Sequence, residues 1–213
     1  MNPYALVALI ILAVAATAQY FLGTRKNRWI VSTMSKGLEE ILRPTATNYV
    51  NIGGSIGYNF SYALSGTWSR AKGTYTVNAR NSLLYLPISL LMGVRDRFFI
   101  NIFTKKNIKG EAHLVAASWL RRANIDGADS MHRRDVDVGG KQFVLLWKGA
   151  DLSSELEKLL NSLVDPARLR HFCAYPGTKT FFVNSTPKLG NVKEDLAIIV
   201  KKLPDFIERG KDK

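Results

Sequence analysis

The hydrophobic pattern of the chain begins with an unbroken apolar stretch. Residues 3 to 22 read PYALVALIILAVAATAQYFL and carry no charged side chain. About 20 apolar residues, each adding about 1.5 Å of helix, match the hydrocarbon core of a bilayer. The pattern therefore predicts a transmembrane anchor, which we place at residues 1–23.

Cations follow this stretch at once and predict its orientation. Arg25, Lys26 and Arg28 come directly after it, whereas the side before it offers only the amino terminus. Because the cationic flank of a span stays in the cytoplasm, we expect a single-pass protein with its N-terminus outside and its domain cytoplasmic. A cleaved signal peptide is the alternative, since the A-x-A motif at residues 16–18 resembles a cleavage site. The lack of a basic segment before the apolar run argues against cleavage.

The spacing of apolar positions in the rest of the chain predicts both helices and strands. Repeats of three or four residues predict helices at 25–43, 82–92, 151–163 and 191–203. Short aromatic and β-branched segments predict strands at 59–64, 73–77, 97–104, 110–117, 142–147 and 178–183. We expect the strands at 97–104 and 110–117 to pair through a turn at 105–109. The polar segments 45–57 and 121–134 are predicted to be loops.

The irregular alternation of these elements favours an α+β fold with a mostly antiparallel sheet and packed helices over a doubly wound parallel sheet. The composition, 46% apolar and 22% charged residues, is that of a globular protein. We therefore expect a single cytosolic domain at residues 24–203, which is long enough for its own core. A basic C-terminal tail is expected at residues 204–213.

The predicted helix at 82–92 is unusual because it is apolar on most of its sides. Such a helix is either deeply buried or a surface on which something docks. Pro87 lies inside the segment and predicts a kink or a late start of the helix.

The charge of the domain is strongly basic. Lys and Arg number 30 against 17 Asp and Glu, and the formal excess of +13 lies beyond the apolar run. This excess favours contact with anionic lipid headgroups or RNA, although a solvated surface is the alternative. The juxtamembrane cations are those named above. The candidate contacts to phosphate or rRNA are Arg121, Arg122, Arg133, Arg134, Lys201, Lys202, Arg209, Lys211 and Lys213.

Catalytic chemistry has little support in the sequence. The histidines His113, His132 and His171 show no metal-ligand spacing to one another or to cysteine, so a catalytic zinc is not expected. The single cysteine, Cys173, permits no internal disulfide and is interpreted as a small buried residue. No catalytic residue, cofactor or small-molecule substrate is predicted, and we expect the protein not to be an enzyme.

Two loops nevertheless keep an enzymatic alternative open. His132 lies three residues before Asp135, and the two side chains could act as a pair, although an exposed histidine is the plainer interpretation. The glycine-bearing segment 53–57 is similar to a phosphate-binding loop but lacks the lysine of a P-loop.

Several segments in order resemble a known family. A transmembrane helix and GTRKN from Gly23 are followed by KGTYTV at 72–77, LLYLPISLLMGVRDRFFINIF at 83–103 and QFVLLWKGADLSSELEKLLNSLVDPARLRHFC at 142–173. Over about residues 20–203, this pattern resembles the cytosolic domain of the calumin-like family, the coiled-coil subunit of the PAT intramembrane chaperone complex.

The resemblance implies a partner-binding role in the insertion of multi-pass membrane proteins. The implied partners are the Sec translocon, the ribosome through its rRNA, and a small multi-pass membrane chaperone subunit. The long acidic lumenal region and the long C-terminal coiled coil of the family have no counterpart in this sequence. Calcium binding is therefore not carried over. The compact chain resembles a short archaeal relative of this family.

We therefore expect a membrane-anchored, non-enzymatic cofactor of membrane protein insertion. The alternative is a membrane-tethered enzyme or lipid-binding domain.

Overall fold

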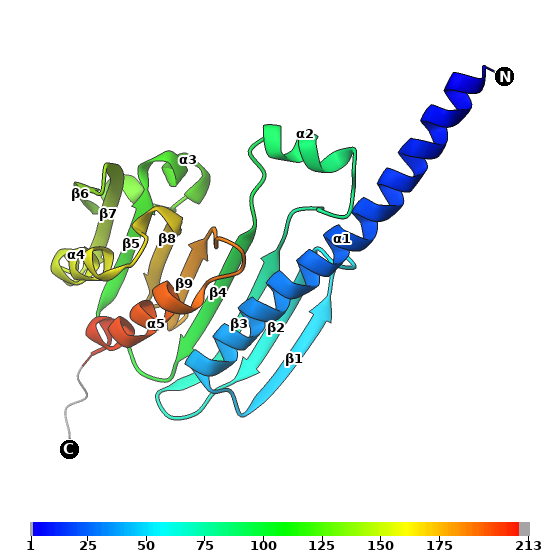
Figure 1. Ribbon diagram of the computed structural model, residues 1–213. Coiled ribbons are helices and arrows are strands. Elements are labelled where there is room, and N and C mark those ends of the chain that lie inside the picture. The colour runs from blue at the N-terminus through cyan, green and yellow to red at the C-terminus, as the bar shows by residue number, and fades with distance from the viewer. Residues whose placement is uncertain (1, 209–213) are drawn as a thin grey trace.

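The computed structural model describes residues 2–208 and confirms an α+β fold (Figure 1). The strands of this part are β1 (Ala46–Asn51), β2 (Gly57–Ala63), β3 (Trp68–Thr76), β4 (Arg97–Thr104), β5 (Gly110–Ala116), β6 (His132–Val138), β7 (Lys141–Gly149), β8 (Leu169–Tyr175) and β9 (Thr180–Ser185). The helices are α1 (Pro3–Leu42), α2 (Tyr85–Leu91), α3 (Leu120–Ala123), α4 (Ser153–Ser162) and α5 (Lys193–Lys202). The 3-10 turns are η1 (Ala117–Trp119), η2 (Ala128–Ser130), η3 (Pro166–Arg168) and η4 (Leu203–Phe206).

The described strands form one antiparallel sheet, in the order β1-β2-β3-β4-β9-β8-β5-β7-β6. Alternate side chains of β4, namely Phe98, Ile100 and Ile102, are buried in the main core. The helices α1, α4 and α5 contribute buried residues to the same core and cover this face of the sheet (Figure 1). A smaller apolar cluster, formed by Val144 and Leu146 of β7 and Met131 just before β6, is packed by residues of η1, α3 and η2.

Helix α1 is continuous for 40 residues and passes through the predicted boundary between anchor and domain. Its apolar N-terminal part has a mean hydropathy of 2.3 over 18 residues, none of them buried, and is long enough to cross a membrane or to act as a signal sequence. Its C-terminal part buries Ile30, Met34 and Leu38, which confirms the amphipathic helix predicted at 25–43. The helix ends where Arg43 turns left-handed before Pro44, which cannot continue it.

Three strands lie where none was predicted. The segment 45–57 contains β1, and the segment 121–134 contains α3, η2 and the start of β6, so the loop predictions there are wrong. Both strands form the edges of the sheet and are largely exposed, so their sequences lack the apolar alternation that reveals a half-buried strand. The third, β8, is buried along most of its length and contains polar His171, which broke the apolar pattern.

The predicted hairpin between the strands at 97–104 and 110–117 is also wrong. Strand β4 pairs with β3 and β9, whereas β5 pairs with β7 and β8. The connection between them does not turn tightly, because Ile108 is buried and forms a bridge with Ile207 at the other end of the chain. Two strands, β9 and β8, therefore lie between β4 and β5 in the sheet.

The remaining predicted elements are present with shifted ends. The segments 59–64, 73–77, 142–147 and 178–183 overlap β2, β3, β7 and β9. The helix predicted from residue 151 is α4, and the carboxylate of Asp151 accepts a hydrogen bond from the Ser153 amide at 3.0 Å. The helix predicted at 191–203 is α5, which has no side-chain cap. Pro87 lies in the first turn of α2, which confirms the predicted late start.

The C-terminal end of the domain lies beyond the predicted boundary at residue 203. Phe206 is completely buried and Ile207 nearly so, and both belong to the main core. The basic tail therefore begins later than residue 204, because Phe206 of η4 packs in the core against Phe172 of β8 and Phe181 of β9.

Replacing Phe206 with alanine tests this assignment. The Phe206 ring lies 5.3 Å from the Phe172 ring and 6.3 Å from the Phe181 ring, centroid to centroid. Because the substitution leaves a cavity, we expect the free energy of unfolding to fall by about 3–5 kcal/mol, measured by urea denaturation of the full-length protein in detergent. The exposed neighbour Asp205, changed to alanine, should leave it unaltered. Equal stability of Phe206→Ala and the wild type would contradict the assignment.

Candidate functional site at the base of the N-terminal helix

One face of α1 is built to receive the segment that joins β3 to β4. Gln19, Gly23 and Asn27 are spaced by four residues and therefore lie above one another on the helix. Gln19 donates a hydrogen bond from Nε2 to the carbonyl oxygen of Arg80 at 2.6 Å. At Gly23 a Cβ atom would collide with the same carbonyl group, so only glycine lets the two backbones approach this closely.

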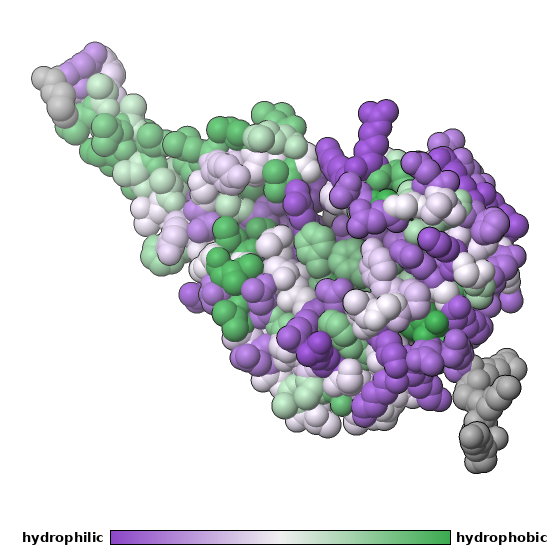
Figure 2. Space-filling model, turned by 180° about the vertical axis from the view of Figure 1, so that it is seen from behind, coloured by the Kyte–Doolittle hydropathy of each residue, from purple (hydrophilic) through white to green (hydrophobic). Residues whose placement is uncertain are grey.

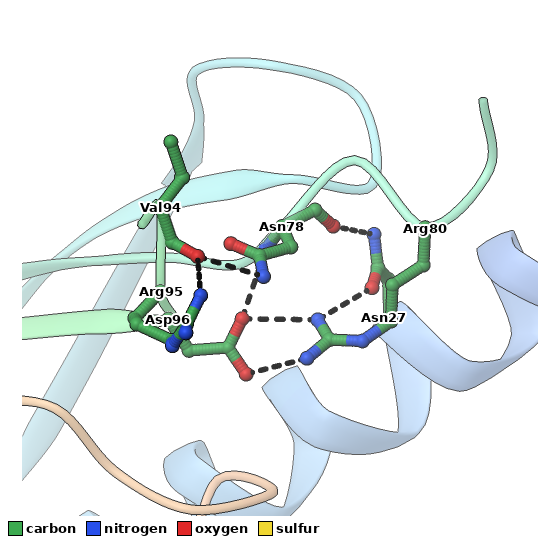
Figure 3. A network of polar contacts seen from close by, with 6 residues as sticks. All are labelled: Asn27, Asn78, Arg80, Val94, Arg95 and Asp96. Carbon is green, nitrogen blue, oxygen red and sulfur yellow. Dashed lines mark hydrogen bonds and ion pairs between the residues drawn. The ribbon is translucent and has the colours of Figure 1, made fainter. Parts of the chain in front are cut away.

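Asn27 connects the helix to a buried ion pair (Figure 3). Its side chain donates to the Asn78 carbonyl at 2.9 Å and accepts from Nη1 of Arg80 at 3.2 Å. Arg80 binds the carboxylate of Asp96 with both terminal nitrogens, at 3.0 and 2.8 Å. The backbone amide of Asn78 also donates to the carboxylate of Asp96, at 2.9 Å. The network thus joins α1, the end of β3 and the start of β4.

The network is largely buried, so its charged and polar groups depend on one another for hydrogen bonds. Asn27 is completely buried, and the side chains of Arg80 and Asp96 are 16% and 5% exposed. A buried charge is costly unless a partner and hydrogen bonds satisfy it, so each member restricts the positions of the others. The network therefore fixes the angle at which α1 leaves the domain.

The three juxtamembrane cations lie on the other faces of this part of α1. Arg25, Lys26 and Arg28 are exposed, within the two turns that follow the apolar run. They are therefore free to contact an anionic surface beside the end of the apolar run.

The predicted phosphate contacts are spread over the molecule. Arg121 and Arg122 are exposed on α3, and Arg122 lies over the ring of Trp119 at 5.4 Å. Arg133 and Arg134 are exposed on β6, and both have acidic partners: Asp135 at 2.9 Å and Glu157 at 3.4 Å. A hollow lined by Leu120, Asn124 and Arg133 shows that α3 and β6 are neighbours.

The remaining predicted contacts belong to a different region. Lys201 is exposed and Lys202 is half-buried in the last turn of α5, which lies on the helical face of the sheet, away from α3 (Figure 1). Arg209, Lys211 and Lys213 lie outside the described residues. The structure thus brings Arg133 of β6 close to α3, whereas Arg134 points to the opposite face of the sheet and pairs with Glu157 of α4. The lysines of α5 lie apart from the arginines of α3.

The structure also brings together three residues that sequence reasoning kept apart. His113 lies opposite Cys173 in the pairing of β5 with β8, and His171 is on the same face of β8. Nδ1 of His113 lies 3.1 Å from Nε2 of His171, and its Nε2 lies 3.1 Å from the carboxylate of Glu111. The side chains of His113, His171 and Cys173 are all buried. One potential ligand atom from each lies within 4.8 Å of the others.

These ligand types suit a soft or borderline metal ion such as zinc. Burial, however, favours the uncharged forms of the groups. It lowers the pKa of His171 to about 3 and lowers that of His113, against the opposing effect of Glu111. Burial also raises the pKa of the Cys173 thiol, although metal ligation needs the thiolate. The cluster is therefore neutral and hydrogen-bonded at pH 7.

The other chemical candidates are separated by the fold. His132 and Asp135 are three residues apart on β6, so they point to opposite faces of the sheet. His132 stacks on Trp147, with ring centroids 5.6 Å apart, while Asp135 is held by Arg133. The glycine segment at 53–57 forms the turn between β1 and β2, where Asn51 bonds the backbone of Gly53 and Gly54.

Replacing Asp96 with alanine tests the buried network. The change leaves Arg80 without its carboxylate, and breaking a buried pair in this way costs about 3–5 kcal/mol of unfolding free energy. The matched control is Asp135→Ala. This substitution removes an exposed carboxylate that binds Arg133 through both of its oxygens, and we expect no measurable change in the free energy of unfolding. Urea denaturation of the full-length protein in detergent measures both. Equal effects of the two substitutions would argue against the special role of the buried network.

Acid titration tests the neutral state of His171. Its pKa is about 3 in the folded protein, below its ordinary value of 6.5, so the unfolded chain takes up a proton that the folded chain does not. Stability conferred by neutral His171 is thus present above pH 6.5 and is lost as the pH falls, by about 1.4 kcal/mol per unit. Between pH 7.5 and 5.5, with a chelator present, the wild type should lose more stability than His171→Gln. His132→Gln, an exposed control, should keep the wild-type slope; equal slopes in all three proteins would refute the assignment.

Comparisons with known proteins leave the function to be argued from this geometry. No protein-family model matches the chain. No curated protein matches it in sequence.

Proposed function

We propose that the protein is a single-pass membrane protein that works by binding partners at the membrane surface and is not an enzyme. The observation that carries the proposal is the rigid connection between α1 and the domain. The exposed apolar part of α1 continues without a break into the part held by Asn27, Arg80 and Asp96. Such a connection suits a domain that must present its surface at a fixed angle to a membrane.

The charges beside α1 support a cytoplasmic domain. Arg25, Lys26 and Arg28 are exposed directly after the apolar run, as the positive-inside rule requires of a cytoplasmic flank. The continuous helix also supports an anchor over a cleaved signal. The A-x-A motif at residues 16–18 lies within α1, and Gln19, which follows it, is bonded to the domain.

The identity of the partners is proposed from the resemblance to the calumin-like family. On this basis the protein is a cofactor of membrane protein insertion that binds the ribosome, the Sec translocon and a small multi-pass chaperone subunit. The exposed arginines of α3, with Arg133 of β6 on the same face of the sheet, support a contact with rRNA phosphates, because arginine binds phosphate oxygens with two parallel hydrogen bonds.

Co-sedimentation with ribosomes in native membranes tests this function. At physiological salt we expect the full-length protein to sediment with ribosomes or the translocon, and the bound fraction to fall as salt is added. The double substitution Arg121→Glu and Arg122→Glu should weaken binding several-fold. The matched control, Lys105→Glu with Lys106→Glu, makes the same change of charge at exposed residues beyond β4 and should bind as the wild type does. Failure of the wild-type protein to sediment with either would remove the main support of the proposal.

A lipid-binding role is the second candidate, and it rests on a specific observation. The surface of α2 exposes large apolar side chains on the side of the domain from which α1 emerges.

A further inference from the structure

Helix α2 and its flanking residues hold most of the large exposed apolar side chains of the described domain after α1. The exposed fraction is 88% for Leu91, 75% for Met92 and 72% for Leu84. The further exposed apolar side chains of this segment are Tyr85, Ile88 and Leu90. In the described residues after α1, the other large exposed apolar side chains are fewer: Val50 and Ile52 at the end of β1, Val164 after α4 and Leu189 before α5. A concentrated patch of this kind marks an interaction surface, whereas scattered exposed residues do not.

The patch is a regular face of α2. Leu84, Ile88, Leu91 and Met92 are spaced by four, three and one residues, which places them along one side of a helix. Ser89 is buried, so this side of α2 faces the domain, and its hydroxyl donates to the Leu86 carbonyl of the same helix at 2.8 Å. The helix therefore presents an apolar side outward and does not contribute it to the core.

The patch lies at the level where the apolar part of α1 ends. Gln19 and Gly23 contact the carbonyl group of Arg80, and α2 begins at Tyr85, only a few residues further along the chain. In Figure 1, α2 lies on the side of the sheet from which α1 projects, and Figure 2 shows an apolar area there beside the anchor. The right-hand side of that view of the domain is predominantly hydrophilic, and smaller apolar areas lie at its left edge and near its middle.

The charges around the patch suit an anionic surface. Residues 2–38 and 79–95 contain no aspartate or glutamate. Arg95 lies at the end of α2, where its guanidinium donates to the carbonyl groups of Leu90 and Val94 at 3.4 and 2.9 Å. The acidic residue that follows, Asp96, is buried against Arg80. Cations thus border the apolar side chains without an exposed carboxylate from either segment.

We propose that α2 is an interfacial helix that lies in the headgroup region of the bilayer crossed by α1. The proposal rests on the proposed membrane span, because α2 would otherwise have no bilayer beside it. The bilayer is the occupant that the geometry favours, since the patch continues the apolar surface of α1 at the same level and is bordered by cations. Helices with an apolar face and basic neighbours bury that face about 5–10 Å into the boundary between headgroups and acyl chains.

A second attachment would change what the membrane fixes. One transmembrane helix sets the distance of the domain from the bilayer but leaves the domain free to rock about the point where the helix emerges. Because α2 is displaced from the helix axis, rocking would change its depth, and its contact with the headgroups would oppose that motion. The surface formed by α3 and Arg133 would then keep one inclination to the membrane.

Depth-dependent fluorescence quenching in liposomes that contain only lipid and the full-length protein tests the proposal. An environment-sensitive fluorophore is attached at L91C and, in separate proteins, at A13C in the apolar run and K201C on α5. All three positions are exposed, so the substitutions should leave the fold intact, and the native Cys173 is buried and should not be labelled. Nitroxide lipids with the quencher at the headgroup, mid-chain or chain end report the depth. The liposomes contain anionic lipid.

If α2 lies in the interface, L91C is quenched several-fold more strongly than K201C, and most strongly by the nitroxides nearest the headgroups, while A13C is quenched by the deep ones. Deep quenching of A13C with L91C no more quenched than K201C would overturn the α2 proposal and leave the membrane span standing. No quenching at either position would overturn both. The fluorophore at L91C could instead be shielded from water by a second copy of the chain. Shielding that disappears when the protein is diluted among the liposomes would identify that occupant and also overturn the proposal.

Discussion

The ion pair between Arg80 and Asp96 is the interaction on which the arrangement of the molecule depends. It lies where the end of β3, the start of β4 and the helix α1 meet, and Asn27 ties the helix to it. Apolar packing alone is tolerant of small rotations of a helix on a sheet. Because directional hydrogen bonds to a buried charge are less tolerant, they select one angle for α1.

The charged residues are sorted along α1. Cations at residues 25–28 follow the apolar run, whereas the first carboxylates, Glu39 and Glu40, occur near the other end of the helix. There they have their own partners: Tyr49 donates to Glu39, and Lys193 of α5 pairs with Glu40. The end of the helix that enters the domain is thus neutralised locally, and the end that leaves it remains positive.

The sequence was sufficient for elements with a clear period and insufficient for those defined by tertiary contacts. The helix at 25–43 and the strand at 97–104 agree with α1 and β4, because their apolar spacing is regular. The exposed edge strands β1 and β6 carry no such signal. Partners that are distant in sequence, such as His113 with His171, meet only through the register of the sheet. For the network, one signal was present: Asn27 is a polar residue in the stripe that continues with Ile30 and Met34.

The unbroken length of α1 makes the helix a mechanical lever. It reaches from Pro3 to Leu42, and about 30 Å of it lies beyond Gly23 on the side of the domain. In the proposed membrane span, α1 would tilt to match the thickness of the bilayer around it, and a change in tilt of about 10° would displace the far end of such a lever by about 5 Å. A headgroup-bound α2 would act as its fulcrum, so that bilayer thickness is converted into the inclination of the sheet.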